Sequence, residues 1–248
     1  LVTTIPASIR KLAEHFSPGP LTFILPRKPT VPDLATAGQP TVAIRIPAHS
    51  ATLRLLSELS FPLAAPSANP FGYVSPTQPE HVLAQLEGTI PYVLDGGAAT
   101  IGVESTIVQP AEKGIEVLRL GGTPVEHLER IVQPVSIQRS NSQNHPDAPG
   151  QLASHYAPGR TRVRVGDPSQ YVRKITANKL GVISFQHWYQ GIPATNQYVL
   201  SPKGNLDEAA RYLFDALRRL DRPELKVVVA EYFPEEGLGR AINDRLAR

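Results

Sequence analysis

Side chains able to bind ligands lie mainly in short turns between apolar runs in the first half of this sequence. The turns place Ser, Thr or Asn beside Pro or Gly, and in chain order they are residues 17–20, 65–69, 75–77, 95–97, 102–106 and 119–122. Loops at strand ends carry ligands disproportionately, so this recurrence favours a binding site. The alternative is that Ser and Asn after Pro cap helices and that paired Gly permits positive φ angles.

Two arginines interrupt otherwise apolar runs and are candidates for anion binding. Arg45 lies in the run Val-Ala-Ile-Arg-Ile, and Arg119 lies near the end of a second run. A planar guanidinium in a cleft binds a carboxylate or a phosphate. The neutral hydrogen bonds of such a cleft would come from Ser67, Asn69, Thr77 and Ser105. The alternative is that each arginine points to solvent from its strand.

The residue types exclude several kinds of catalytic site. The chain has no cysteine, which excludes disulfides, thiolate metal sites and a cysteine nucleophile. Its seven histidines lie far apart in the sequence and show no metal-ligand spacing. No zinc-protease, Walker or serine-hydrolase motif is present, and the absence of G-x-G-x-x-G leaves dinucleotide binding unsupported. The sequence therefore predicts no nucleophile and no metal ligands.

The elements of the first part predict a mixed α/β domain in which strands outnumber helices. Helical spacing over residues 9–16 ends at the turn 17–20. Strands are expected at 21–25, 42–46, 62–65, 92–94, 106–108 and 115–120, and further helices at 50–59, 79–86 and 125–132. Thr77-Gln-Pro-Glu80 has the spacing of a capping box.

The second part alternates strands and helices, which predicts a small parallel, Rossmann-like sheet. Strands are expected at 162–165, 180–185 and 225–230, and helices at 169–176, 206–220 and 238–246. The helix at 206–220 has one clear apolar face. Asn205 is positioned to cap it, with Glu208 three residues further on.

Composition divides the 248 residues into two domains and a linker. Residues 1–132 hold 9 Lys/Arg and 11 Asp/Glu, and residues 133–248 hold 16 and 11. The polar, Pro/Gly-bearing stretch 133–158 is predicted to link domains 1–132 and 159–248. The uncharged stretch 59–79 contains five prolines and cannot be one membrane-spanning helix. We expect no membrane association and a cytoplasmic location.

The turn motifs resemble those of the YrdC-type family. The similar motifs are residues 17–23, 41–47, 65–69, 75–77, 94–97, 102–108 and 118–122. Residues 149–158 and 237–246 resemble the extra domain of the longer members, the threonylcarbamoyl-AMP synthases. The resemblance spans nearly the whole chain. It implies an α/β fold in which a YrdC-like twisted mixed sheet with helices is joined by a long linker to a smaller Rossmann-like domain.

The family condenses L-threonine, bicarbonate or CO2 and ATP into threonylcarbamoyl-AMP, releasing pyrophosphate, and a downstream transferase complex modifies tRNA with the product. The resemblance implies that Arg45 holds the threonine carboxylate, with Ser67 and Ser105 near the amino acid. It implies that the ATP contacts are Thr41, Asn69, Thr77, Arg119, His155 and Tyr156. The last two would belong to a lid over the nucleotide. ATP is a substrate, Mg²⁺ is the expected cofactor, and no residue acts as a nucleophile.

The sequence departs from the family pattern at its start. Family members begin with a segment whose Lys-x-Arg motif grips the phosphates, and no residue here matches it. We therefore expect the N-terminal part of the catalytic domain to be missing from this chain, and a chain that truly lacks it to bind ligands poorly and not to turn over. Gln109 and Leu120 are minor departures.

Two other functions remain open. A carbamoyl-adenylate-forming domain of a carbamoyltransferase is disfavoured by the absence of cysteine and by the synthase-like tail. A non-catalytic RNA- or tRNA-binding module is suggested by the basic second part. Its candidate cations are Arg160, Arg162, Arg164, Arg173, Lys174 and Lys179. The alternative is that these cations form an ordinary solvated surface. Few aromatic residues lie between them, so stacking on single-stranded RNA bases has little support.

Overall fold

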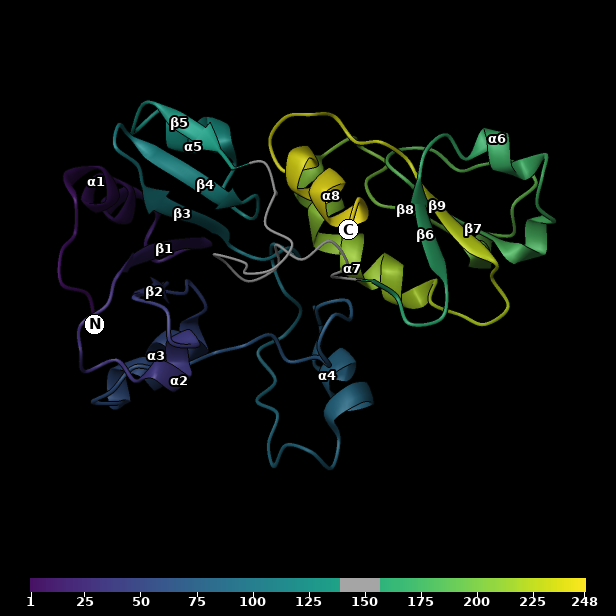
Figure 1. The fold of residues 1–248 in the computed structure, drawn as a ribbon. Helices are drawn as coiled ribbons and strands as arrows, with labels where there is room; N and C mark the ends of the chain where they lie inside the picture. The colour runs from purple at the N-terminus through teal and green to yellow at the C-terminus, as the bar shows by residue number, and fades with distance from the viewer. Residues whose placement is uncertain (139–156) are drawn as a thin grey trace. The chain divides into compact units, whose positions relative to one another are not determined.

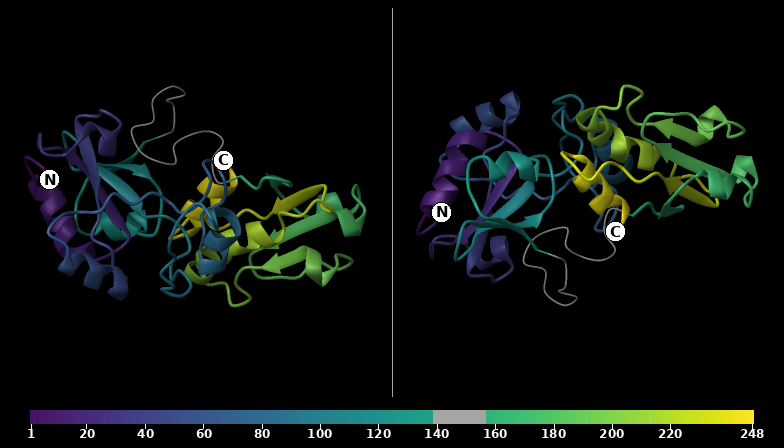
Figure 2. Two further views of the ribbon diagram at one scale, coloured as in Figure 1. Left: turned by 90° about the horizontal axis from the view of Figure 1, so that it is seen from below. Right: turned by 90° about the horizontal axis from the view of Figure 1, so that it is seen from above.

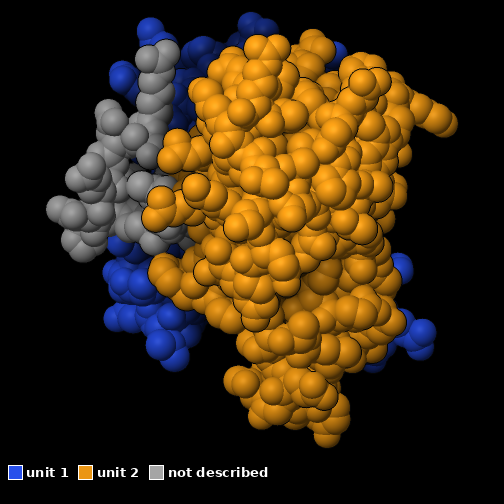
Figure 3. Space-filling model, turned by 90° about the vertical axis from the view of Figure 1, so that its right-hand side faces the viewer, with its two compact units in different colours: residues 1–66, 104–151 blue, residues 67–103, 152–248 orange. Residues whose placement is uncertain are grey.

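The computed structural model describes residues 1–138 and 157–248, which form two compact units (Figures 1 and 3). Unit 1 consists of residues 1–66 and 104–151, and unit 2 of residues 67–103 and 152–248. The units therefore do not follow chain order, because residues 67–103 cluster with the C-terminal part. No helix in the described ranges is long and apolar enough to cross a membrane.

Unit 1 is built on a mixed five-stranded sheet of order β2-β1-β3-β4-β5. The strands are β1 (Leu21–Pro26), β2 (Thr41–Ile44), β3 (Thr106–Pro110), β4 (Ile115–Arg119) and β5 (Val135–Ile137). β1 pairs antiparallel with β2 and parallel with β3, and β4 pairs antiparallel with β3 and parallel with β5. The mixed sheet predicted from the sequence is confirmed.

Alternation along β1 decides which side of this sheet is covered by helices (Figure 2). Leu21, Phe23 and Leu25 belong to a buried cluster with Ile9 and Leu12 of one helix and Leu128 of another. Thr22 and Ile24 point to the other face, because successive side chains of a strand alternate. The helices of this unit are α1 (Ala7–Phe16), α2 (Asp33–Thr36), α3 (Ser50–Glu58) and α5 (Val125–Glu129).

Three expectations for local structure were wrong. Residues 62–65 and 92–94 form no strand. Pro62, Pro66 and Pro91 lack the backbone N–H groups that a sheet requires. An extended segment that has no neighbouring strand also cannot form inter-strand hydrogen bonds. Residues 135–137, assigned to the linker, form β5 because they pair with β4. Most of the predicted linker lies outside the described residues.

Unit 2 contains a parallel four-stranded sheet of order β6-β9-β7-β8, as the alternating pattern predicted. The strands are β6 (Arg162–Val165), β7 (Leu180–Ser184), β8 (Gln197–Val199) and β9 (Val227–Ala230). The helices are α4 (Pro79–Leu86), α6 (Ser169–Val172), α7 (Leu206–Arg219) and α8 (Gly239–Leu246), with 3₁₀ turns at Ala177–Lys179 and Ala194–Asn196. The short strand β8 was not predicted.

Both faces of this parallel sheet are covered. On β9, Val228 and Ala230 pack in the cluster that contains the apolar side of α7, while Val227 and Val229 pack with partly buried Tyr171 and Val172 of α6. Burial on both sides explains why the strands read as continuous apolar runs rather than as alternating ones.

The predicted N-terminal cap of α7 is present, and Ser201 takes part in it as well. The backbone N–H of Glu208 donates to Asn205 Oδ1 at 2.9 Å. The Glu208 carboxylate does not return to the backbone of Asn205, because Ser201 Oγ lies between them. Ser201 Oγ donates to Glu208 Oε2 at 2.5 Å and accepts from the backbone N–H of Asn205 at 2.9 Å.

We expect Asn205→Ala to lower the free energy of unfolding by about 1 kcal/mol, because it removes the acceptor for one N–H of the first turn of α7. Urea unfolding followed by circular dichroism measures this change. Lys203→Ala, an exposed change two residues away, is the matched control. Equal stability of the two variants would show that the cap contributes nothing.

Candidate functional site

Polar side chains from four segments gather at one end of the unit 1 sheet. β2 runs antiparallel to β1 with Ile44 opposite Phe23, so Arg45 lies beside the start of β1. β3 is parallel to β1 with Thr106 opposite Leu21, which brings Ser105 to the same end. Arg119 ends the antiparallel strand β4, opposite Ile107. The pairing thus brings together the predicted residues Arg45, Ser105 and Arg119.

Arg119 is held rigidly rather than solvated. Its side chain is only 8% exposed. Nε and Nη2 donate to the carbonyl oxygen of Ser105 at 3.1 and 2.9 Å, and Nη2 donates to Ser105 Oγ at 3.2 Å. The interpretation of Arg119 as a surface residue was therefore wrong.

Thr22 completes this cluster and was missed as a functional residue. Its Oγ1 lies 2.7 Å from Ser105 Oγ, so the two hydroxyls share a hydrogen bond. Thr22 is a buried polar residue in an otherwise apolar strand. A single hydroxyl between Leu21 and Phe23 could have indicated this role in the sequence. Threonine has a high β-strand propensity, however, so its presence in a strand needs no functional explanation.

Backbone contacts fix the loops that carry Ser105 and Arg119. Buried Thr106 donates from Oγ1 to the carbonyl of Thr123 at 2.7 Å and accepts the Thr123 N–H at 2.9 Å. A Cβ on Gly121 would lie 2.3 Å from the carbonyl oxygen of Glu104. Glycine is therefore required at position 121 by the close approach of two backbone segments.

Arg45 differs from Arg119 in its surroundings. The residue is exposed overall, yet partial burial of the guanidinium lowers its pKa from the ordinary value. Arginine titrates so far above neutrality that the group stays cationic. Thr41 lies on the same strand opposite Pro26, at the other end of β2 from Arg45. Its predicted contact with ATP stays a prediction.

Ser67, Asn69 and Thr77 belong to unit 2. Ser67 is exposed, and its carbonyl accepts the N–H of Asn69 at 3.0 Å. Asn69 Nδ2 donates to the carbonyls of Pro70 and Tyr73 at 2.8 and 3.1 Å. Its Oδ1 is buried, with no hydrogen-bond partner in the described part of the chain. An unpaired buried acceptor costs about 1–3 kcal/mol, so this oxygen favours a ligand that donates a hydrogen bond.

Thr77 does not form the predicted capping box. The N-cap of α4 is Gln78, which makes no side-chain cap bond, and Pro79 follows. The backbone N–H of Thr77 donates instead to His81 Nδ1 at 3.2 Å, and Thr77 Oγ1 lies 3.4 Å from the same atom. The imidazole of His81 therefore satisfies the backbone N–H of Thr77, the role that the Glu80 carboxylate would have in a capping box.

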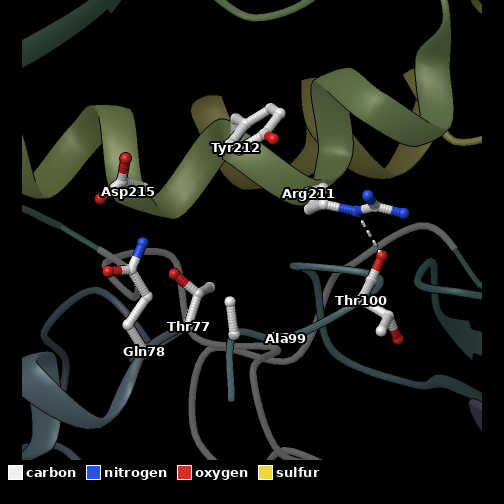
Figure 4. Close-up of a pocket in the computed structure, with 8 residues that line it drawn as sticks. Thr77, Gln78, Ala99, Thr100, Arg211, Tyr212 and Asp215 are labelled. Atoms are coloured by element: carbon white, nitrogen blue, oxygen red, sulfur yellow. Dashed lines mark hydrogen bonds between the residues drawn. The ribbon is translucent and has the colours of Figure 1, made fainter.

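A cavity of about 200 Å³ lies beside Thr77 within unit 2 (Figure 4). Its wall is formed by Thr77, Gln78, Ala98, Ala99, Thr100, Arg211, Tyr212 and Asp215. Ligand pockets for drug-sized molecules usually enclose about 300–1,000 Å³. This cavity is therefore too small for a nucleotide, and the predicted contact between Thr77 and ATP does not follow from it.

His155 and Tyr156 lie outside the described residues, and so does the lid that they were expected to form. Across the described ranges, no group of three or more His, Cys, Asp or Glu side chains could hold a metal ion.

His81 predicts a pH dependence of stability. Burial and the charge of Arg218 lower the pKa of His81 from 6.5, and they outweigh the opposite effects of Asp215 and Glu80. Below about pH 6.5 the unfolded chain binds a proton more readily than the folded one, so stability falls as the pH decreases. We expect His81→Gln to reduce the loss of stability between pH 7 and pH 5. Urea unfolding across this range tests it, and identical pH profiles would contradict it.

Comparison with known proteins places these residues in a family. The Sua5/YciO/YrdC family model, described as "Telomere recombination", matches residues 1–121. A second model, described as "Threonylcarbamoyl-AMP synthase, C-terminal domain", matches residues 123–248. The two matches meet near residue 122, whereas the compact units interleave.

Two relatives and one solved structure match nearly the whole of this chain. The threonylcarbamoyl-AMP synthase of Pyrococcus abyssi is 37% identical over 100% of this chain and 75% of its own length. That of Bacillus subtilis is 36% identical over 98% of this chain and 73% of its own length. The crystal structure of P. abyssi Sua5 complexed with L-threonine matches with a TM-score of 0.88 and 37% identity, over 99% of this chain and 74% of that one. The expected α/β fold class is confirmed, and the chain belongs to the threonylcarbamoyl-AMP synthase family.

Proposed function

We propose that this chain condenses L-threonine, bicarbonate and ATP into threonylcarbamoyl-AMP and pyrophosphate. The observation that carries the proposal is the cluster at one end of the unit 1 sheet, where buried Arg119 is fixed on Ser105 and Arg45 directly follows β2 at the same end. Two guanidiniums with hydroxyls between their strands suit two anionic substrates. Membership of the synthase family supports the same reaction.

Arg45 binds the carboxylate of threonine in this proposal. Its guanidinium is partly desolvated, which strengthens its attraction to an anion relative to a fully solvated arginine. Ser105 lies near the amino acid, and its hydroxyl is oriented by Thr22 and Arg119. Ser67 is the second serine near the amino acid.

Arg119, Asn69, Thr77 and Thr41 contact ATP, with His155 and Tyr156 in the lid. The unpaired Oδ1 of Asn69 supports its role, because ATP carries hydroxyl and amino donors on its ribose and adenine. Arg119 supplies positive charge for the phosphates from a site where burial limits its motion.

The reaction requires positioning rather than a protein nucleophile. The amine of threonine takes up CO2 derived from bicarbonate, losing a proton and forming a carbamate. A carbamate oxygen then attacks the α-phosphorus of ATP, and the bond to the bridging oxygen breaks with release of pyrophosphate. Holding two anions together and neutralising charge at phosphorus lowers the barrier. Arg45 and Arg119 would perform these two tasks.

The proposal also includes a magnesium ion, a downstream enzyme that uses the product, and a cellular location. When bound together with ATP, Mg²⁺ would supply positive charge to the phosphates. The product is a reactive mixed anhydride, so it must pass to a downstream transferase complex that acts on tRNA. The cytoplasm is the location that we propose for these steps.

We expect Arg45→Ala to raise the KM for threonine and Arg119→Ala to raise the KM for ATP, each by about 10- to 100-fold, because a hydrogen bond to a charged group contributes about 1.5–3 kcal/mol. Pyrophosphate release measures both constants. Arg54→Ala, which removes an exposed arginine from α3, is the matched control.

Omission of substrates tests the reaction itself. Pyrophosphate release should stop when threonine or bicarbonate is left out, since the carbamate needs both. Release that requires neither would refute the proposal. Because Arg119 is buried, circular dichroism must show that its variant folds, and Arg119→Lys provides a milder change. Equal small effects of the Arg45 and Arg119 variants would contradict the assigned roles.

A basic groove in unit 2 favours RNA binding as a second function. The groove encloses about 540 Å³ and is lined by Arg160, Arg162 and Arg164, together with Arg245 and Arg248 of the C-terminal end. In the described part of the chain the first three guanidiniums have no carboxylate partner. Arg162 and Arg164 are alternate residues of β6, about 6.6 Å apart, and Arg160 lies two residues before the strand, so these cations suit successive phosphates.

Salt dependence tests this second function. Three phosphate contacts contribute about 2 to the slope of log K against log salt concentration. We expect the triple Arg→Gln variant at 160, 162 and 164 to lose that contribution for a tRNA transcript in filter binding. The double Gln variant of Lys203 and Lys226 is the control, because both residues are exposed outside the groove. An unchanged slope in the triple variant would refute RNA binding here.

A further inference from the structure

Residues 67–103, which we name the docked segment, carry Ser67, Asn69 and Thr77 but have little regular structure of their own. α4 is their one helix, and they contribute no strand to either sheet. They cluster with the C-terminal part of the chain rather than with the rest of residues 1–121. The position of their ligand-binding turns must therefore be set by contacts with other elements of unit 2.

The contacts come from one side of α7. Arg211, Asp215 and Arg218 are four and three residues apart, which places them on one helical face. Arg211 Nε donates to the carbonyl of Thr100 at 2.7 Å (Figure 4). Asp215 Oδ1 lies 3.5 Å from His81 Nε2. The three residues form a polar stripe along the docked segment.

Arg218 makes the densest set of contacts. It donates to the backbone carbonyls of Val74 and Ser75, the latter at 3.3 Å, and to Gln85 Oε1 at 2.9 Å. Its guanidinium also lies over the ring of Tyr73, 5.0 Å from the centroid. Burial lowers its pKa from the ordinary value, while Tyr73, Asp215 and Asp221 oppose the change. One side chain thus links the turn before Thr77 to the helix after it.

Further contacts hold the turns on both sides of Arg218. Tyr73 Oη donates to Asp221 Oδ2 at 2.8 Å, and the same carboxylate accepts backbone N–H groups of residues 159–161. Val74 is fully buried in the core that contains the apolar side of α7. At the other end, a Cβ on Gly102 would lie 2.4 Å from the backbone of Arg211, so the segment touches the helix directly.

These constraints extend to the predicted ATP residues. Thr77 lies two residues beyond Ser75, and its carbonyl accepts the N–H of Ala99 at 2.8 Å. Asn69 donates to the carbonyl of Tyr73, whose ring and hydroxyl are held by Arg218 and Asp221. Displacement of residues 73–75 would therefore move Asn69 on one side and Thr77 on the other.

We propose that α7 positions the ATP-binding turns of the docked segment and that Arg218 is the positioning residue. The C-terminal domain is then a structural part of the catalytic site rather than an appendage. The inference rests on the proposed contacts of Asn69 and Thr77 with ATP. Arg218 itself touches no substrate in this scheme.

Hydrogen exchange of the ligand-free chain tests the positioning directly. Arg218→Ala should accelerate amide exchange in residues 72–85 at least tenfold while leaving the strands β7 and β9 unchanged. Arg219→Ala is the matched control, since this exposed neighbour pairs with Asp215 Oδ2 at 2.8 Å and stacks on Tyr198, within the C-terminal domain. Exchange in residues 72–85 that is unchanged in Arg218→Ala would overturn the proposal.

Kinetics separate positioning from general destabilisation. Arg218→Ala should raise the KM for ATP about tenfold and leave the KM for threonine within twofold. Arg218→Lys should recover only part of the effect, because a single ammonium cannot reproduce the planar fork or the stacking on Tyr73. Tyr73→Phe should produce a smaller change in the same direction. Faster amide exchange in residues 72–85 together with an unchanged KM for ATP would also overturn the proposal.

The two measurements distinguish the inference from the proposed function. If the full-length wild-type protein releases no pyrophosphate with threonine, bicarbonate and ATP, the proposed function fails. Binding of a non-hydrolysable ATP analogue by calorimetry then replaces the kinetic readout. Weaker analogue binding by Arg218→Ala, with Arg219→Ala unaffected, would still support the positioning role, and equal binding by the two variants would refute it.

Discussion

Donation from arginine side chains to backbone carbonyls is the interaction on which the loops of this protein depend. Of the 248 residues, 25 are proline, and each removes a backbone donor while keeping its carbonyl. Proline-rich turns therefore hold more acceptors than donors. Arg119 satisfies the carbonyl of Ser105, Arg218 those of Val74 and Ser75, and Arg211 that of Thr100. In each case the guanidinium donates the hydrogen bond that a neighbouring strand would otherwise donate to the carbonyl.

This constraint explains why burial of arginine accompanies the candidate site. A carbonyl has no net charge, so the guanidinium that it binds keeps its full positive charge and its remaining attraction for anions. Arg119 thereby stabilises the loop before β3 through the carbonyl and hydroxyl of Ser105. Structural support and anion binding are thus compatible in one side chain.

Unit 2 shows how far the catalytic and C-terminal parts depend on each other. The family models divide the chain once, near residue 122, but the packing of Val74 and the contacts of Arg218 join residues 67–103 to α7. Sequence similarity follows the order of the chain, whereas packing follows whichever surfaces bury apolar area. A segment with one short helix cannot bury its own core and must use that of a neighbour.

The sequence by itself determined the periodic elements, the parallel sheet of unit 2 and the cap at Asn205, because each depends on spacing or local chemistry. The predictions from sequence were wrong where tertiary contacts overrode local preference. Residues 62–65 have no partner strand, whereas residues 135–137 pair with β4. The predicted capping box at Thr77 is absent, and His81 accepts the Thr77 N–H instead. Only the tertiary structure decided that Arg119 is buried on Ser105 and that α7 holds residues 67–103. The physical reason is that these contacts join residues far apart in the chain, and no local pattern records which carbonyl a guanidinium will reach.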